Sequence, residues 1–235
     1  YLGDSAMRND YVRILEIYLE AYTTAFDSVQ KLSKTMGNSE ADLKRYQDAF
    51  YRMEGLVDDA EFKWEQNDTY FTNYYTVTPM EDPTAAQLRT LRSLSIYVQD
   101  IRSAYASVPF LVKDVQATVK KKQFDNLEDA RQSLTEKAEQ AMVAVSNVGD
   151  YVDENEEEDD FLKSAALYYL EYVRSGSEED FEAALLQLDE ARYEEKESQV
   201  EKAQWKIDEV LQDFIETELD LNDRISKFVA HYVKE

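Results

Sequence analysis

The residue types that perform most acid–base and metal chemistry are scarce in this sequence. The chain of 235 residues has one histidine, His231, and no cysteine. A di-iron helical bundle needs a Glu-x-x-His motif from each of two helices, and zinc peptidase motifs need at least two histidines. Thiolate nucleophiles, disulfides and soft metal sites need cysteine. The sequence excludes these classes of site, and we interpret His231 as a surface or packing residue.

The sequence also lacks the motifs of phosphate-binding loops and calcium-binding loops. No two of the 5 glycines lie close enough to form a glycine-rich loop, which argues against the usual modes of ATP, GTP and dinucleotide binding. The acidic run from Asp153 to Asp160 lacks the central glycine and alternating ligands of a calcium loop. An enzyme that used buried carboxylates would need inward-facing acids, which the apolar pattern does not show. We therefore expect no catalytic, cofactor-binding or metal-binding residues, and a protein that is not an enzyme.

One aromatic cluster could bind a partner. Tyr70, Phe71, Tyr74 and Tyr75 lie within residues 67–83, a stretch that holds two of the 3 prolines and breaks the helical apolar pattern. We predict a loop there. Exposed aromatic side chains on a loop would form a surface for a protein or a glycan. Alternatively, the loop folds across one end of the bundle and caps it.

The elements that would position these residues are helices. The chain has few glycines and prolines to supply the regular turns that a sheet protein needs. Apolar residues instead recur at steps of three and four, as they do along one face of a helix. The clearest runs begin at Tyr11, Leu43, Leu88 and Leu127, and the first continues through Ile14, Tyr18 and Tyr22. This pattern predicts an all-α fold, an antiparallel bundle of five or six long helices with coiled-coil-like packing, in a single domain over residues 1–235.

Several residues mark expected helix ends. Gly37 should stop the first helix, and Ser39 followed by Asp42 resembles a capping box for the second. Pro109 predicts a kink or short break rather than a new domain. The mutually repelling acids of residues 150–160 predict a solvated loop. The helix that begins at Phe161 should stop at Ser175-Gly176, and Ser177 is expected to cap the last segment.

The C-terminal segment leaves two alternatives open. Its apolar stripe disappears over residues 194–198 and then resumes. Either one helix over 181–235 projects beyond the bundle, or a short break separates two helices. The absence of glycine and proline after Phe181 favours the continuous helix.

The net charge restricts the partners. Fifty acidic and 26 basic residues give a charge of −24, which repels nucleic acid and anionic lipid. We interpret Lys120, Lys121 and Lys122 as partners of a helix dipole. No stretch approaches the roughly 18 apolar residues of a transmembrane segment. The chain begins at Tyr1 rather than Met, so we expect an upstream segment, for which a cleaved export signal is one explanation.

The C-terminal part resembles a known family. The residues Asp160-Phe161-Leu162-Lys163-Ser164-Ala165-Ala166, leading into Leu170-Glu171-Tyr172, and the stretch from Val210 to Tyr232 are similar to helical bacterial surface proteins, many of them lipoproteins, of unknown function. This resemblance covers about a third of the chain. It implies export and a lipid-bearing cysteine upstream of Tyr1, and it implies no catalytic residues. Within the chain, residues 10–22 and 159–173 are loosely similar, too weakly to define a repeat.

Two functions remain as hypotheses. The first is a non-enzymatic helical-bundle protein, located in the bacterial periplasm or on the cell surface, that acts by binding or scaffolding, with a protein as its possible partner. The second is an intracellular, cytoplasmic adaptor that pairs with another helix through its long C-terminal helix. The upstream sequence would separate them, because a signal segment followed by cysteine supports the first.

Overall fold

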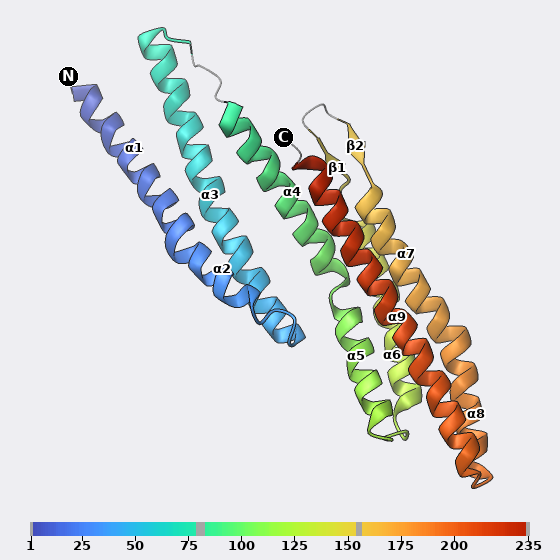
Figure 1. Cartoon of the computed structure of the whole chain (residues 1–235). Coiled ribbons are helices and arrows are strands. Elements are labelled where there is room, and N and C mark those ends of the chain that lie inside the picture. Colours follow the sequence, from blue (N-terminus) through green and yellow to red (C-terminus); the bar gives the residue numbers. More distant parts are fainter. Residues whose placement is uncertain (1, 79–82, 154–156, 234–235) are drawn as a thin grey trace. The chain divides into compact units, whose positions relative to one another are not determined.

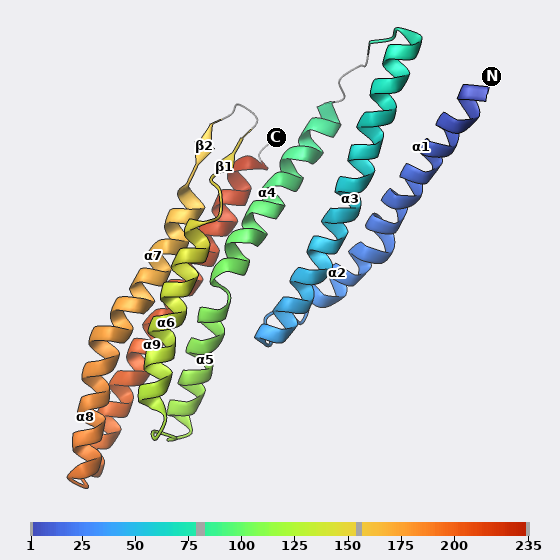
Figure 2. The same cartoon turned by 180° about the vertical axis from the view of Figure 1, so that it is seen from behind.

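The protein is all-α, as the apolar pattern predicts. A computed structural model describes residues 2–78, 83–153 and 157–233 (Figures 1 and 2). Contacts divide the chain into two compact units, Tyr1–Ala85 and Ala86–Glu235, and each is described by itself. The single domain expected over residues 1–235 stays a prediction.

Unit 1 is a helical hairpin. Its elements are α1 (Leu2–Glu20), the π-helical turn η1 (Ala21–Ala25), α2 (Phe26–Ser33) and α3 (Glu40–Tyr75). Both α1 and α2 contact α3. The Ser39 Oγ accepts a hydrogen bond from the Asp42 backbone N–H at 3.1 Å, so the predicted cap is confirmed. The buried apolar side chains of this hairpin are few: Ile14, Ala21, Val29, Phe50, Met53, Val57 and Ala60.

Unit 2 is a four-helix bundle. Its elements are α4 (Pro83–Tyr105), α5 (Ser107–Lys120), α6 (Leu127–Ser146), β1 (Tyr151–Val152), β2 (Glu158–Asp159), α7 (Phe161–Gly176), the π-helical turn η2 (Ser177–Phe181), α8 (Glu182–Tyr193) and α9 (Glu197–Tyr232). The contacts form a closed ring, because α5 packs on α6, α6 on α7, and α9 on α5, α7 and α8. Figures 1 and 2 show these rods side by side. One large apolar core fills the ring, with Tyr169, Phe181, Phe214, Leu162 and Ile207 among its fully buried members.

Proline and the acidic run act much as expected, with one correction. The helix breaks at Ala106, between α4 and α5 and three residues before Pro109, and no new domain begins there. The acidic segment is not wholly a loop, because β1 and β2 pair antiparallel, Tyr151 with Asp159. Residues 154–156 of the expected loop lie outside the described residues. The pairing places the Asp159 carboxylate where it accepts a hydrogen bond from the Tyr232 hydroxyl at 2.7 Å.

Ser177 does not cap a helix, so that prediction was wrong. The chain passes from α7 through η2 into α8 without leaving helical backbone. Ser177 is fully buried. Gly176, expected to stop the helix, instead permits close packing, because a Cβ there would lie 2.6 Å from the Phe214 Cε1. This glycine is therefore a packing residue inside a helix.

The continuous helix over residues 181–235 was also wrong. The helix ends at Tyr193, and α9 begins at Glu197 and packs back on α8. Glu195 takes a left-handed φ of 56°. This conformation usually selects glycine, and its use by glutamate explains why a search for glycine and proline missed the turn.

The hairpin formed by α1, α2 and α3 and the hairpin formed by α7, α8 and α9 have the same order of elements. In each hairpin an α-helix passes through a five-residue π turn, continues, and reverses through a short connection into a helix of 36 residues, which is α3 in one and α9 in the other. A π turn adds one residue to the helical repeat and commonly shifts the face that follows it. Pairing the first residues of the π turns sets Ala21 against Ser177, both fully buried. Pairing the starts of the long helices sets Glu40 against Glu197.

Candidate binding surfaces

The aromatic cluster named from the sequence lies on a helix. Tyr70, Phe71, Tyr74 and Tyr75 occupy the last two turns of α3, so the predicted loop was wrong for residues 67–75. The rings of Tyr70 and Tyr74 stack with centroids 6.1 Å apart, and Phe71 and Tyr75 lie 4.8 Å apart. Such pairs four residues apart stabilise a helix. The helix ends at Thr76, which has a φ of 54°, and residues 79–82 of the expected loop lie outside the described residues.

The exposure of this cluster favours a binding surface over a cap. Tyr70 and Tyr74 are 62% and 68% exposed, and Tyr75 is also exposed. A ring that capped the end of its hairpin would be largely covered. We call these four residues the α3 aromatic end, and its role in binding a partner stays a prediction.

A second apolar surface follows α1 and its π turn. Val12, Leu15, Leu19, Tyr22 and Phe26 are all exposed, with Leu19 at 65%. They step by three, four, three and four residues, so they form a stripe on one side of the helix. The side that contacts α3 is different and holds Ile14 and Ala21. We call these five residues the α1 stripe.

The spacing of this second stripe is present in the sequence but was not predicted as a separate series. Tyr22 was predicted to lie in the buried series of the first helix, and it is 59% exposed. One amphipathic face was taken to account for the apolar residues, whereas α1 carries two neighbouring faces. A search for two series at steps of three and four would have found both.

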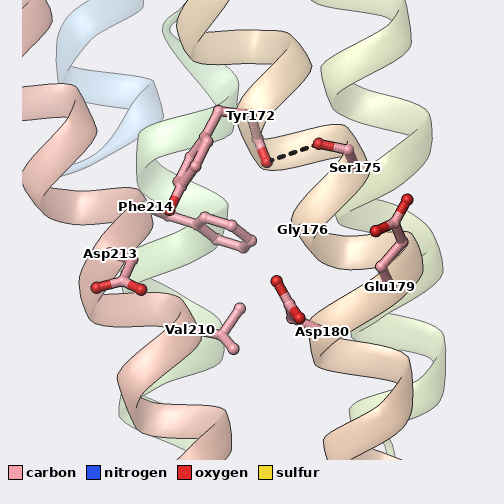
Figure 3. A pocket seen from close by; sticks show the side chains of 8 residues that line it. All are labelled: Tyr172, Ser175, Gly176, Glu179, Asp180, Val210, Asp213 and Phe214. Atoms are coloured by element: carbon pink, nitrogen blue, oxygen red, sulfur yellow. Dashed lines mark hydrogen bonds between the residues drawn. The ribbon is translucent and has the colours of Figure 1, made fainter.

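A small hollow lies beside the second π turn, in unit 2. It has a volume of about 90 Å³ and is lined by Tyr172, Ser175, Gly176, Glu179, Asp180, Val210, Asp213 and Phe214. Figure 3 shows the Phe214 ring pointing from α9 toward Gly176, and the Ser175 Oγ donating to the Tyr172 carbonyl oxygen at 3.5 Å. The lining has three carboxylates and no basic residue, so it does not suit an anionic ligand.

Nearby charges are paired on the surface. The Arg174 guanidinium donates to both Glu171 carboxylate oxygens at 2.6 and 2.9 Å, and it also pairs with Glu178. These hydrogen bonds lower the pKa of Glu171 below its ordinary value. The arrangement keeps the outward face of α7 ionised and hydrated.

The lone histidine is a surface residue in the last turn of α9. His231 is exposed and lies edge-on to the Tyr232 ring with centroids 5.0 Å apart. Within residues 2–78, 83–153 and 157–233, no group of three or more histidine and carboxylate side chains is arranged to hold a metal ion. None of the helices in those ranges combines the length and apolar character needed to cross a membrane.

The fold and these surfaces define an all-α protein built from helical hairpins. Exposed apolar residues occur in both units, and on the first hairpin five of them follow one another along the α1 stripe. Protein-family models, curated proteins and solved structures were compared with the chain, and none matches it. The resemblance to bacterial surface proteins therefore remains a prediction.

Proposed function

We propose that the protein is a non-enzymatic binding or scaffolding protein, exported or attached to a bacterial envelope, and that its first hairpin holds the binding surface. The observation that carries this proposal is the α1 stripe. Its five side chains expose on the order of 500 Å² of largely apolar surface. A patch of that size on a soluble domain is commonly a site of protein association. The α3 aromatic end adds three exposed tyrosine rings to the same hairpin.

The difference in core size supports this assignment of roles. Two helices bury few side chains, and helical stability in proteins comes mainly from packing an apolar face. Unit 1 leaves a second apolar face exposed, so covering it would release ordered water and stabilise the hairpin. The helices of unit 2 surround one apolar core, so we assign unit 2 the role of a structural support.

An intracellular adaptor is the second candidate, but it would bind through a different helix from the one predicted from the sequence. The original hypothesis used the C-terminal helix for pairing. The apolar stripe of α9 is buried in unit 2 and leaves only the separate residues Trp205 and Leu219 exposed. An adaptor would therefore pair through α1.

The proposal of export is tested separately by sequencing the gene upstream of Tyr1. A signal segment followed by cysteine supports export, and a start codon followed by neither a signal segment nor a cysteine contradicts it.

Photo-crosslinking in native cells tests the binding function. A photoreactive amino acid replaces Leu15 or Tyr74 in unit 1, or, as the control, Leu219, which is 61% exposed on α9. We expect discrete heavier adducts at Leu15 and Tyr74, and a weak smear or none at Leu219. Equal labelling at all three positions, or no adduct at Leu15 and Tyr74, would contradict the proposed surface.

A further inference from the structure

We infer that the α1 stripe binds the same stripe of a second copy of this chain, antiparallel and around a twofold axis at Leu19. This inference rests on the proposed function, because it names the partner of the same surface. Steps of three and four residues are the spacing of a coiled-coil seam, in which apolar side chains interdigitate across two helices. Isologous twofold contacts of this kind are the commonest form of oligomer.

The order of residues makes the stripe complementary to itself only when the helices run antiparallel. With Leu19 on the axis, Val12 lies opposite Phe26 of the second copy, and Leu15 lies within one residue of the position opposite Tyr22. On either side of the axis a smaller side chain thus meets a larger one, which fills the seam evenly. A parallel pair would set Phe26 against Phe26 and Val12 against Val12, leaving the seam crowded at one end and open at the other.

Charge favours the same direction. Arg8 precedes Val12 by four residues and extends the line of the stripe. In the antiparallel pair it lies opposite Gln30 of the second copy and within one turn of its Asp27, a charge of opposite sign. In a parallel pair Arg8 would face Arg8, and Glu16 at the edge of the stripe would face Glu16. Like charges placed this way are unfavourable.

The area is sufficient for a reversible dimer. Each copy contributes on the order of 500 Å², so the pair buries on the order of 1,000 Å², the lower end of specific interfaces. Two copies of charge −24 also repel each other. Salt screens that repulsion and leaves apolar burial intact, so the dimer should strengthen as ionic strength rises.

Sedimentation of the full chain over a range of concentration tests the inference. We expect a monomer–dimer equilibrium that shifts toward dimer in high salt. Leu19→Glu places two carboxylates together on the axis and should weaken dimerisation at least about 10-fold. Phe62→Glu is the matched control, because Phe62 is 61% exposed on α3 and lies outside the stripe. Circular dichroism of both variants should match that of the parent chain.

A charge exchange tests the register. Leu15→Glu and Tyr22→Lys should each weaken self-association, and mixing the two variants should restore it, since residues 15 and 22 lie close together only in the antiparallel pair. A parent chain that stays monomeric at every concentration and salt overturns the inference, as does a Leu19→Glu variant that dimerises normally. A mixture that does not associate overturns the antiparallel register.

The two proposals can fail separately. Crosslinks from Leu15 to a protein of another mass, together with a monomeric parent chain, would retain the binding function and overturn the self-association. Absence of crosslinks together with a monomer would overturn both.

Discussion

Two hairpins in this molecule share a plan and differ in the face that they turn outward. Leu15, Leu19, Tyr22 and Phe26 of the first hairpin are exposed apolar residues. Counted from the π turns, their equivalents in the second hairpin are Glu171, Ser175, Glu178 and Glu182, which are polar and mostly acidic. The equivalent of Val12 is the exposed Tyr168, so the exchange covers four of the five positions of the α1 stripe. The backbone plan is the same, so the amino acids on that face decide whether it is hydrated or available for binding.

The opposite exchange has occurred on the long helices. Leu211 and Ile225 of α9 are buried in the bundle, and the equivalent residues of α3 are the buried Glu54 and the half-buried Asp68. At these positions the second hairpin packs apolar residues against the other helices of its own unit. The first hairpin has polar residues at the same two positions and carries an exposed apolar stripe on α1. Under our proposal, the second hairpin therefore has an internal partner and the first an external one.

The largest effect expected from this comparison concerns the cores. Phe214 of α9 is 1% exposed, and its equivalent in α3, Val57, is 2% exposed. Phe214→Ala should lower the free energy of unfolding of unit 2 by about 3–5 kcal/mol, because it removes a ring and leaves a cavity. Val57→Ala should lower that of unit 1 by about 2 kcal/mol. Urea unfolding followed by hydrogen exchange measures each unit, and equal losses would contradict the difference in packing.

Alkaline pH should affect unit 2 more than unit 1. Burial raises the pKa of Tyr97 and of Tyr105 from 10.0 to about 12. The pKa of each tyrosine is higher in the folded chain than in the unfolded chain, so the unfolded state ionises first as pH rises. The stability that these two buried tyrosines contribute is complete below pH 10.0 and is lost as pH rises toward about 12. In unit 1, Tyr22 and Tyr70 are exposed rather than buried. Circular dichroism across that window should show a smaller loss in a Tyr97→Phe, Tyr105→Phe variant, and an unchanged profile would refute the cause given.

Two glycines inside helices should respond in opposite directions. Gly176→Ala forces the buried Phe214 ring to move and should destabilise unit 2 by about 1–3 kcal/mol. Gly55→Ala meets nothing within 4 Å and should stabilise unit 1 by about 0.5–1 kcal/mol, because alanine favours helix. Thermal unfolding measures both. A stabilising Gly176→Ala would show that the ring does not need the space.

The smallest effects concern the two connections. Ser39 caps α3 with its side chain, whereas Lys196 precedes α9 without a side-chain hydrogen bond to the helix. Ser39→Ala should destabilise the first hairpin by about 1 kcal/mol, and Lys196→Ser should stabilise the second by up to about 1 kcal/mol. Hydrogen exchange of the first turns of α3 and α9 reports both changes, and no response in either turn would rule out this role for the caps.

The sequence predicted the helices well and their ends unevenly. Steps of three and four from Tyr11 to Tyr232 identified the helical rods, and Ser39 with Asp42 located one cap, because these signals are local. The turn at Glu195 was missed because a non-glycine residue takes left-handed backbone there. The end of α3 was predicted too early, at residue 67 instead of Tyr75. Gly176 was misread because a glycine can serve packing as well as termination, and the neighbouring ring comes from a distant part of the chain.

The candidate site was predicted in part. The four aromatic residues of the α3 aromatic end were named correctly as a cluster, and their exposure on a helix could not be read from a segment rich in turn-forming residues. The α1 stripe was present in the spacing but was merged with the buried series. Whether an apolar position faces a core or water depends on how many helices surround it, which spacing does not record.

Disulfide crosslinking tests the central claim, that the first hairpin binds and the second does not, most directly. The chain has no cysteine, so single cysteines can be placed freely. Leu19 on α1 and Leu186 on α8 are both leucines and both 65% exposed. Under mild oxidation, Leu19→Cys should form a disulfide-linked dimer in high yield at dilute concentration, and Leu186→Cys should stay monomeric. Equal crosslinking of the two variants would contradict the assignment of the binding surface to the first hairpin, and no crosslinking at Leu19 would contradict self-association through the α1 stripe.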